Sequence, residues 1–440
     1  GHREQRRSGA RAAMAAEESS DLSGVKDVKR YDRQIRLWGA DTQRGLQSAR
    51  ILVIGANGLA NEVCKNLVLA GIAHCTVQDA GILSEADLIE SALFSVASEH
   101  KGTSRAQALV EQLREMNPTV ELEARQASVA TLDADFLRSF HFVICAARGA
   151  GALRDAAVCT ALVEGRGGAD ATTGEPPDEP PAKRHRANGD SGPPLARSNG
   201  AHLVVPLRVS DGGPAPRILA AGTVGLEGYC FFDLGEAHAK VQPPKKADAN
   251  PDADGKTAPP AAPPVLERAL YPTVTSACQV EWAALTKRVP RVYHALQLLA
   301  HASSASAAAA AAAATPLADA TSLLPAGTPK GTVELLQVML TRRAELLHGT
   351  SDVGKAATPE YLAEVAQSVG LELAPVCAVL GGMIASEVVK IIGGKERPIH
   401  NALFFDGVSA DGVVQRLGPS FDCPWGLDKG EFKALAPLES

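Results

Sequence analysis

Length, composition and charge exclude several classes of protein. The chain has 440 residues, enough for a substantial core, and a formal net charge of −6 at pH 7. A nucleic-acid binder draws most of its affinity from a basic face, so we expect no nucleic-acid partner, and the apolar runs are too short or too charged for us to expect a membrane span. The eight cysteines are scattered without a C-x-x-C pair, so we expect no metal site.

Composition divides the chain into low-complexity and foldable parts. Segments rich in Pro, Gly and charge cannot bury enough apolar surface to offset their ordering entropy. We therefore expect a disordered tail over 1–25, a disordered insert over 167–200, a disordered linker over 242–264, a low-complexity Ala-rich insert over 301–330 and a tail over 420–440. The foldable parts are 26–166, a continuation of its sheet over 201–241, a helical segment over 265–300, and C-terminal helices with a hairpin over 331–419.

The foldable residues alternate between strand and helix patterns. In chain order they predict a strand over 50–55, a helix over 58–70, a strand over 74–79, a helix over 103–117, strands over 119–126 and 140–147, and a helix over 153–164. This βαβαβ order predicts an α/β fold with a doubly wound, Rossmann-like mixed sheet.

The later foldable parts carry three further predictions. Residues 217–235 predict two short strands about a glycine-containing turn, and 402–418 predict a hairpin with its tip at Asp411-Gly412 or nearby. The stretch 374–392 is apolar on nearly every side, which is typical of a buried helix. Because Gly381 and Gly382 each weaken a helix, we expect both to allow close approach to a neighbouring element.

A degraded nucleotide loop follows the first strand. "ILVIGANGLANEV" (51–63) begins like a G-x-G-x-x-G turn at Gly55, but Asn57 and Ala60 stand where the later glycines belong. Asp79, near the end of the second strand, is placed as the acid that binds the ribose of NAD. One hypothesis is therefore an NAD-binding Rossmann oxidoreductase, although no catalytic His or Tyr/Lys set accompanies it.

Three stretches together resemble a known family. "YDRQIRLWG" shortly before the first strand, "APVCAVLGGMIASEVVKIIGG" and "ALFFDGVSADGVVQRLGPS" are similar to the non-catalytic subunits of heterodimeric enzymes that activate ubiquitin-like modifiers, which have a ThiF/MoeB-like adenylation fold. Within that family the stretches resemble the subunits that serve SUMO. The regulatory subunit of the Nedd8-activating enzyme is the alternative.

The resemblance implies a pseudo-adenylation domain that does not bind nucleotide. Active members have a G-x-G-G-x-G loop, an acidic D-x-D pair and downstream Arg and Lys residues that bind ATP. At the matching positions this chain has Gly55, Asn57, Gly58, Ala60, Asp79, Gly81, Glu90 and Arg105. A side chain at Asn57 obstructs the backbone approach that glycine permits, and Glu90 repels phosphate. We therefore expect no cofactor in this chain.

The resemblance places ATP, Mg²⁺ and the thioester-forming cysteine in a catalytic partner subunit, which adenylates the C-terminus of SUMO. It assigns Arg33 as an arginine finger that reaches the partner's ATP in trans. Tyr31, Arg36 and Trp38 are candidate interface residues, and Arg36 fits an interface salt bridge as well as a phosphate contact.

Two points stay open. A purely structural partner, with no catalytic side chain, is the second hypothesis about function. The family implies a nuclear protein, with the cytoplasm as a second location, and the basic cluster Lys183–Arg186 fits either an import signal or a solvated charge run.

Overall fold

The computed structural model describes residues 22–84, 87, 101–165, 215–241, 265–303, 322–347 and 356–418. The expected disordered segments 167–200, 242–264 and 420–440 lie outside the described residues, as do most of 1–25 and of 301–330. Glu90 and the basic cluster Lys183–Arg186 also lie outside them.

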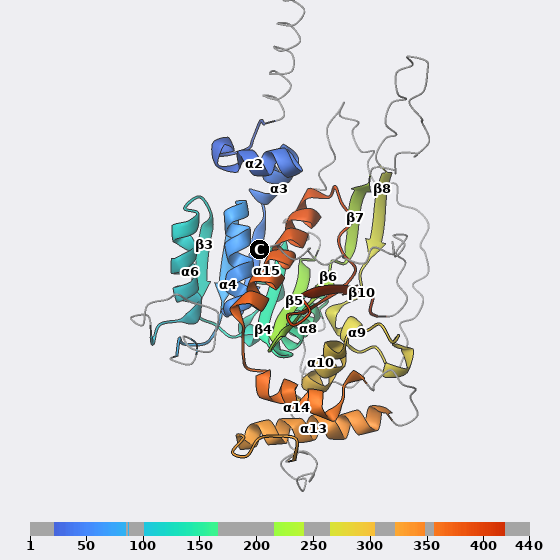
Figure 1. Ribbon diagram of the computed structural model, residues 1–440. Helices are drawn as coiled ribbons and strands as arrows, with labels where there is room; N and C mark the ends of the chain where they lie inside the picture. The colour runs from blue at the N-terminus through green and yellow to red at the C-terminus, as the bar shows by residue number, and fades with distance from the viewer. Residues whose placement is uncertain are drawn as a thin grey trace, which may run out of the picture.

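An eight-stranded mixed sheet forms the centre of the molecule (Figure 1). Its parallel half has the spatial order β3-β2-β1-β4-β5 and contains β1 (Arg50–Ile54), β2 (His74–Gln78), β3 (Glu121–Arg125), β4 (Phe142–Arg148) and β5 (Arg217–Val224). The strand order reverses between β1 and β4. In open α/β sheets ligands bind at such a reversal, outside the carboxyl ends of the strands. The predicted α/β, doubly wound architecture is confirmed.

The antiparallel half contains β6 (Glu227–Asp233), β9 (Ala402–Asp406) and β10 (Asp411–Gln415), added in the order β5-β6-β9-β10. The predicted hairpin is formed by β9 and β10, and its turn lies directly before the Asp411-Gly412 pair. Asp411 pairs with Asp406, so the turn spans 407–410, with Ala410 at φ 59°. Asp-Gly is a strong turn signal, yet the register of the neighbouring strands places it inside β10.

A separate two-stranded ribbon pairs β7 (Glu236–Val241) with β8 (Val265–Leu270). Two predictions need correction here. The sheet continues through β5 and β6 but not through 236–241, and the segment 265–300 begins with a strand rather than a helix. The rest of that segment is helical: α9 (Val274–Cys278), the 3₁₀ turn η3 (Trp282–Ala284) and α10 (Arg291–Ala302).

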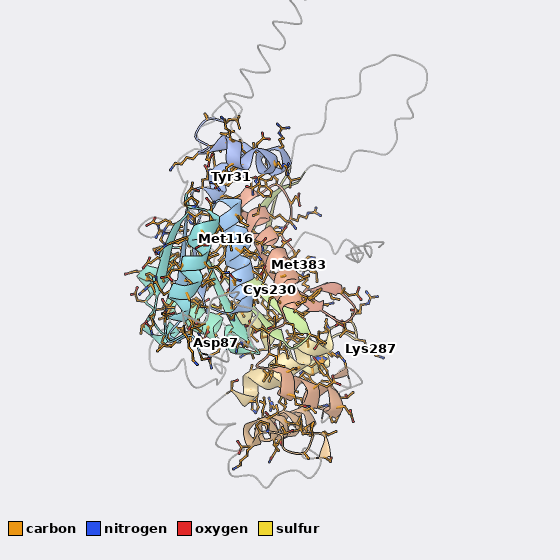
Figure 2. The ribbon with its side chains drawn as sticks, turned by 60° about the vertical axis from the view of Figure 1, so that its left-hand side comes forward. Tyr31, Asp87, Met116, Cys230, Lys287 and Met383 are labelled. Carbon is orange, nitrogen blue, oxygen red and sulfur yellow. The ribbon has the colours of Figure 1, made fainter. Side chains whose placement is uncertain are left out.

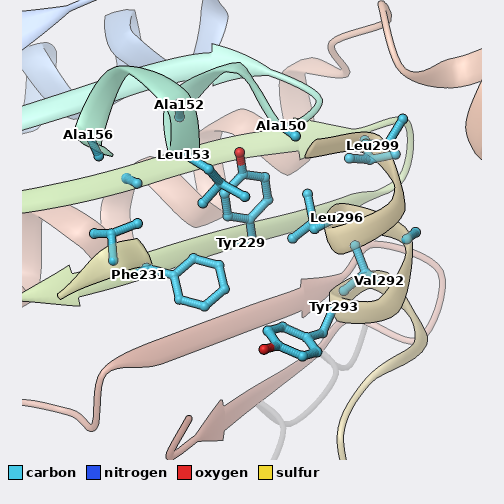
Figure 3. Close-up of a cluster of buried hydrophobic side chains, with 14 of the residues drawn as sticks. Ala150, Ala152, Leu153, Ala156, Tyr229, Phe231, Val292, Tyr293, Leu296 and Leu299 are labelled. Carbon is cyan, nitrogen blue, oxygen red and sulfur yellow. The ribbon is translucent and has the colours of Figure 1, made fainter. Parts of the chain in front are cut away.

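Helices cover both faces of the sheet and form two cores. One face packs against α3 (Ala40–Leu46), α4 (Gly58–Ala70), α6 (Arg105–Met116) and α15 (Ala374–Gly393). The second core lies on the other face and includes α7 (Ala134–Arg138), α8 (Gly151–Val163), α9, α10 and α14 (Pro359–Ser368), with η2 (Val129–Thr131) at its edge. The helix α13 (Lys330–Leu347) packs on α10 and α14. Figure 3 shows part of the second core, where Tyr229 and Phe231 of β6 meet Tyr293 and Leu296 of α10. The helix α2 (Val28–Trp38) lies at one end of this assembly (Figure 1).

The predicted buried helix is α15, which packs along α4 (Figure 1). Close approach is confirmed at Gly381, where an added Cβ would lie 2.6 Å from the Cβ of Glu62 and 3.1 Å from the backbone nitrogen of Val63. It is wrong at Gly382, which faces open space. By length and composition α15 could cross a membrane, but a buried core helix meets the same criteria, and 56% of its most apolar window is buried inside the molecule.

Candidate functional site

The loop after β1 keeps the backbone of a nucleotide turn. Gly55 has φ 100°, and its N–H donates to the carbonyl of Gln78 at 2.8 Å. A Cβ at this position would collide with the carbonyl oxygen of Ala146 on β4. The turn therefore needs glycine for two reasons, the positive φ and the close approach of β4. It lies at the reversal of strand order between β1 and β4.

Asn57 converts the next part of the loop into a structural cap. Its side-chain oxygen accepts a hydrogen bond from the N–H of Ala60 at 2.8 Å, which is N-capping of α4. Its amide nitrogen donates to the carbonyl of Ala146 at 3.1 Å, which ties the loop to β4. The side chain thus fills the position where the second glycine of the loop pattern leaves space for a ligand.

A carboxylate from a distant part of the chain occupies the N-terminus of α4. Glu372, in the connection between α14 and α15, accepts hydrogen bonds from the N–H groups of Gly58 at 3.1 Å and Leu59 at 3.4 Å. Its side chain is 1% exposed and also accepts from Arg148 Nε at 3.2 Å. In nucleotide-binding folds the exposed N–H groups of this helix turn bind phosphate.

Asp79 is held inside the site. Its Oδ2 accepts from the N–H of Ala56 at 2.8 Å, and its Oδ1 accepts from the N–H of Gly81 at 2.6 Å and from Arg105 Nη2 at 2.8 Å. A Cβ on Gly81 would collide with the Arg105 guanidinium, so the small residue at position 81 makes room for that arginine. Both oxygens of Asp79 accept hydrogen bonds within the chain, so the carboxylate stabilises its own loop, which argues against the ribose-binding role of the NAD hypothesis.

The charged groups of the site pair with one another in a continuous row. Arg105 Nη1 lies 3.4 Å from Asp87 Oδ1, and Arg148 Nη2 lies 3.6 Å from the same oxygen. Arg148 also forms a salt bridge with Glu372, with 3.2 Å between Nε and Oε2. Three carboxylates, those of Asp79, Asp87 and Glu372, against two guanidinium groups leave a net charge of −1. Because both arginines are already neutralised, the described residues of the site offer no unpaired cation to a phosphate.

The surroundings favour the ionised forms of Arg105 and Asp87. Burial opposes the charge of Arg105, but Asp79 and Asp87 outweigh it and raise the pKa of the guanidinium. Burial likewise opposes ionisation of Asp87, but hydrogen bonds from Ser84 and the charges of Arg105 and Arg148 lower the pKa of its carboxyl. The charges of Arg105 and Asp87 therefore support each other as a salt bridge.

The sequence predicted some residues of this site but not the residues that pair with them. Asn57, Asp79, Gly81 and Arg105 come together as their positions in the pattern predict. Asp87, Arg148 and Glu372 were not predicted. Glu372 lies 314 positions from Gly58, and a single glutamate between two leucines looks like a solvated residue, so no local signal could have found it.

The helix α2 carries the second group of predicted residues, and one of them needs correction. Tyr31 is 2% exposed: its hydroxyl accepts from Asn117 Nδ2 at 2.9 Å, and its ring packs against Gly71. It anchors α2 to its own chain and is not an interface residue in this structure. Trp38 is half-buried, with its indole N–H donating to Gln43 Oε1 at 3.4 Å.

The two arginines of α2 differ in their environment. Arg36 pairs with Asp32 one turn earlier, with 3.1 Å between Arg36 Nε and Asp32 Oδ2. Arg33 is exposed, and among the residues that the structure describes none forms an ion pair with it. The exposed apolar side chain of Leu37 lies one turn further along the same helix.

α2 and the degraded loop lie at opposite ends of the domain. Tyr31 contacts Gly71, which follows the C-terminus of α4, whereas Glu372 binds the N-terminus of α4. The 13 residues of α4 span about 20 Å at 1.5 Å per residue. Figure 2 shows the same separation between Tyr31 and Asp87. Arg33 is therefore not placed to serve the loop of its own chain.

Among the described residues, no group of His, Cys, Asp or Glu side chains could hold a metal ion. The seven described cysteines are free, and six of them are buried. Burial raises the pKa of the thiols of Cys278 and Cys377, which favours the protonated, unreactive form.

The sheet and its loop define the class of domain: residues 31–149 match the model of the ThiF family. Over nearly its full length the chain is similar to SUMO-activating enzyme subunit 1. It is 26% identical over 411 residues to that of Danio rerio, covering 90% of this chain and 97% of the relative. The same protein of Rattus norvegicus is 26% identical over 421 residues, covering 91% and 99%. DNA damage tolerance protein RHC31 of Saccharomyces cerevisiae is 24% identical over 398 residues, covering 88% and 95%. The predicted resemblance is confirmed.

Proposed function

We propose that this chain is the non-catalytic subunit of a heterodimeric SUMO-activating enzyme. The observation that carries the proposal is the similarity to SUMO-activating enzyme subunit 1 over 90% of this chain and 97% of the relative. The alternative of a Nedd8-activating subunit has no comparable support from the relatives described above.

The site geometry supports a division of labour between two subunits. The residues of this chain do not fit a bound nucleotide, because Asn57 fills the loop, Glu372 occupies the helix N-terminus and both arginines of the site are paired. The catalytic partner subunit would hold ATP and Mg²⁺ and adenylate the C-terminal carboxylate of SUMO, with release of pyrophosphate. A cysteine of the partner would then attack the acyl-adenylate, and the complex would act in the nucleus.

The contribution of this chain to that chemistry would come from α2. Arg33 is exposed and lies about the length of α4 away from the loop of its own chain. An exposed guanidinium presented to another subunit can neutralise the charge that develops on triphosphate oxygens. Tyr31 would fix the helix that carries this arginine, while Arg36 and Trp38 remain candidates for the subunit interface.

Arg33→Ala tests this role in the reconstituted pair. We expect SUMO-dependent ATP–pyrophosphate exchange to fall about a hundredfold or more, because removal of an arginine finger has effects of at least this size. The complex should still elute as a heterodimer in gel filtration.

Arg30→Ala is the matched control, since it removes the same charge one turn earlier on α2 from an exposed residue that is already paired with Asp27. It should change exchange by no more than a few-fold. Unchanged exchange in Arg33→Ala would favour the purely structural partner instead.

A further inference from the structure

We infer that Glu372 is a built-in anion, which occupies the phosphate position at the N-terminus of α4 and keeps this chain's own loop closed to nucleotide phosphate. The inference goes beyond the proposed function, because it assigns a role to a residue that closes this chain's own loop, which takes no part in the reaction proposed for the partner subunit. It depends on the internal contacts of Glu372.

The contacts of Glu372 are those of a bound phosphate oxygen pair. Both carboxylate oxygens face the first turn of α4, with Oε2 3.1 Å from the nitrogen of Gly58 and Oε1 3.4 Å from that of Leu59. The N-terminus of a helix carries a partial positive charge of roughly half a unit, and a carboxylate there satisfies N–H groups that have no intrahelical partner. Arg148 supplies the cation on the other side.

The backbone holds the carboxylate in this place. Glu372 forms a parallel β-bridge with Gly225, in the turn between β5 and β6. Its neighbours Leu371 and Leu373 are 42% and 37% exposed, whereas its own side chain is 1% exposed. A charged group between two leucines thus points inward while the apolar groups point outward, the reverse of what burial alone favours. The salt bridge with Arg148 and the hydrogen bonds from the N–H groups of Gly58 and Leu59 compensate for the cost of burying the Glu372 carboxylate.

The test is rescue of a Glu372→Ala variant by inorganic phosphate, using the full chain without its partner. Removal of the carboxylate leaves Arg148 and the N–H groups of Gly58 and Leu59 facing a space that an anion can fill. We expect a lower unfolding midpoint than in the natural chain. Added phosphate, at constant ionic strength, should raise it by roughly 3 °C or more near saturation. The natural chain should show no phosphate-dependent shift beyond the general effect of salt.

Two variants serve as controls. Glu364→Ala removes an exposed carboxylate from α14 with the same change of net charge, and phosphate should not shift its midpoint specifically. Glu372→Gln keeps the volume but loses the charge, so it should be destabilised yet gain no phosphate response. If Glu372→Ala does not fold without phosphate, its refolding in phosphate but not in chloride gives the same answer.

Equal phosphate responses in Glu372→Ala and in the natural chain would overturn the inference, as would a Glu372→Ala variant that is as stable as the natural chain and binds no phosphate in calorimetry. Neither readout depends on SUMO or on the partner subunit. Failure of this inference is therefore distinguishable from failure of the proposed function.

Discussion

Asn57 shows how one residue changes a nucleotide turn into a structural one. Its side chain makes two hydrogen bonds, one within α4 and one to β4, where a glycine would make none. The loop can thus retain its course, with Gly55 at positive φ, while it loses the space for a ligand. At this position the backbone conformation of a nucleotide turn is kept, although a side chain fills the space for the nucleotide.

Asn57→Ala should lower the free energy of unfolding by about 1–2 kcal/mol, because it removes an N-cap and a buried bond to the carbonyl of Ala146. Asn66→Ala in the same helix is the control. Asn66 is a helix-interior residue whose amide donates to the carbonyl of Glu62, and alanine is a better helix former there. Urea unfolding of both variants measures the difference, and equal losses would contradict the capping role.

The candidate site also shows what a sequence pattern can predict at the scale of residues. Substitutions within the loop pattern, such as Asn57 and Gly81, identify the site as degraded because each position has a known steric or charge requirement. The pairing that replaces the ligand is a property of the fold. Arg105 meets Asp79 across 26 positions and Arg148 meets Glu372 across 224, and no local spacing encodes either contact.

At the scale of elements, the contact between α15 and α4 depends on one glycine of an adjacent pair. Gly381 faces Glu62 and Val63 of α4 with no room for a Cβ, whereas Gly382 points away from neighbouring atoms. Two helices can approach this closely only where one side chain is absent. The sequence predicted a close approach for both glycines because the pattern alone does not give the rotation of the helix.

The two adjacent glycines of α15 allow a matched test of this contact. Gly381→Ala should destabilise the protein by about 1–3 kcal/mol, because the new methyl group forces α15 away from α4. Gly382→Ala should stabilise it by up to about 1 kcal/mol, because alanine favours the helix and meets nothing. Thermal unfolding of the two variants distinguishes them. The same sign of change in both would mean that the helices are not packed as described.

The elements themselves were predictable where hydrophobic periodicity was long. Each strand of the parallel half and its crossover helix follow from alternation of apolar patterns along the chain. The ribbon of β7 and β8 did not follow, since its strands lie on either side of a Pro-rich segment and pair only with each other. The turn at 407–410 lies directly before the Asp411-Gly412 signal, because the register between the strands decides where the chain reverses.

For the whole molecule, stability should depend on pH through a histidine in the second core. His294 of α10 is fully buried beside the ring of Trp282, and burial lowers its pKa to about 4. The unfolded chain has the ordinary pKa of about 6.5, so it binds the proton first as the pH falls. Stability is therefore lost progressively between about pH 6.5 and pH 4.

His294→Phe should remove the part of the pH-dependent loss of stability that is due to protonation of His294. Between pH 7 and pH 5 the natural chain should lose about 1–2 kcal/mol more than the variant, as measured by urea unfolding at each pH. Parallel losses in the two proteins would show that His294 is not held neutral in the fold.

The arrangement of the whole domain separates a structural end from a functional one. The degraded loop is closed by the chain's own charges, while α2, at the other end of α4, presents Arg33 to solvent. Under the proposed function, the chain would have lost nucleotide binding and would still contribute an arginine to another subunit's site.

The most direct test of the proposed division between the closed loop and α2 is SUMO-dependent ATP–pyrophosphate exchange. It is measured for this chain alone, for the catalytic subunit of the SUMO-activating enzyme alone, and for the two co-expressed. We expect exchange by the pair and none by this chain alone. Exchange by this chain alone would contradict this expectation, because a loop closed by Asn57 and Glu372 could not then be closed to ATP.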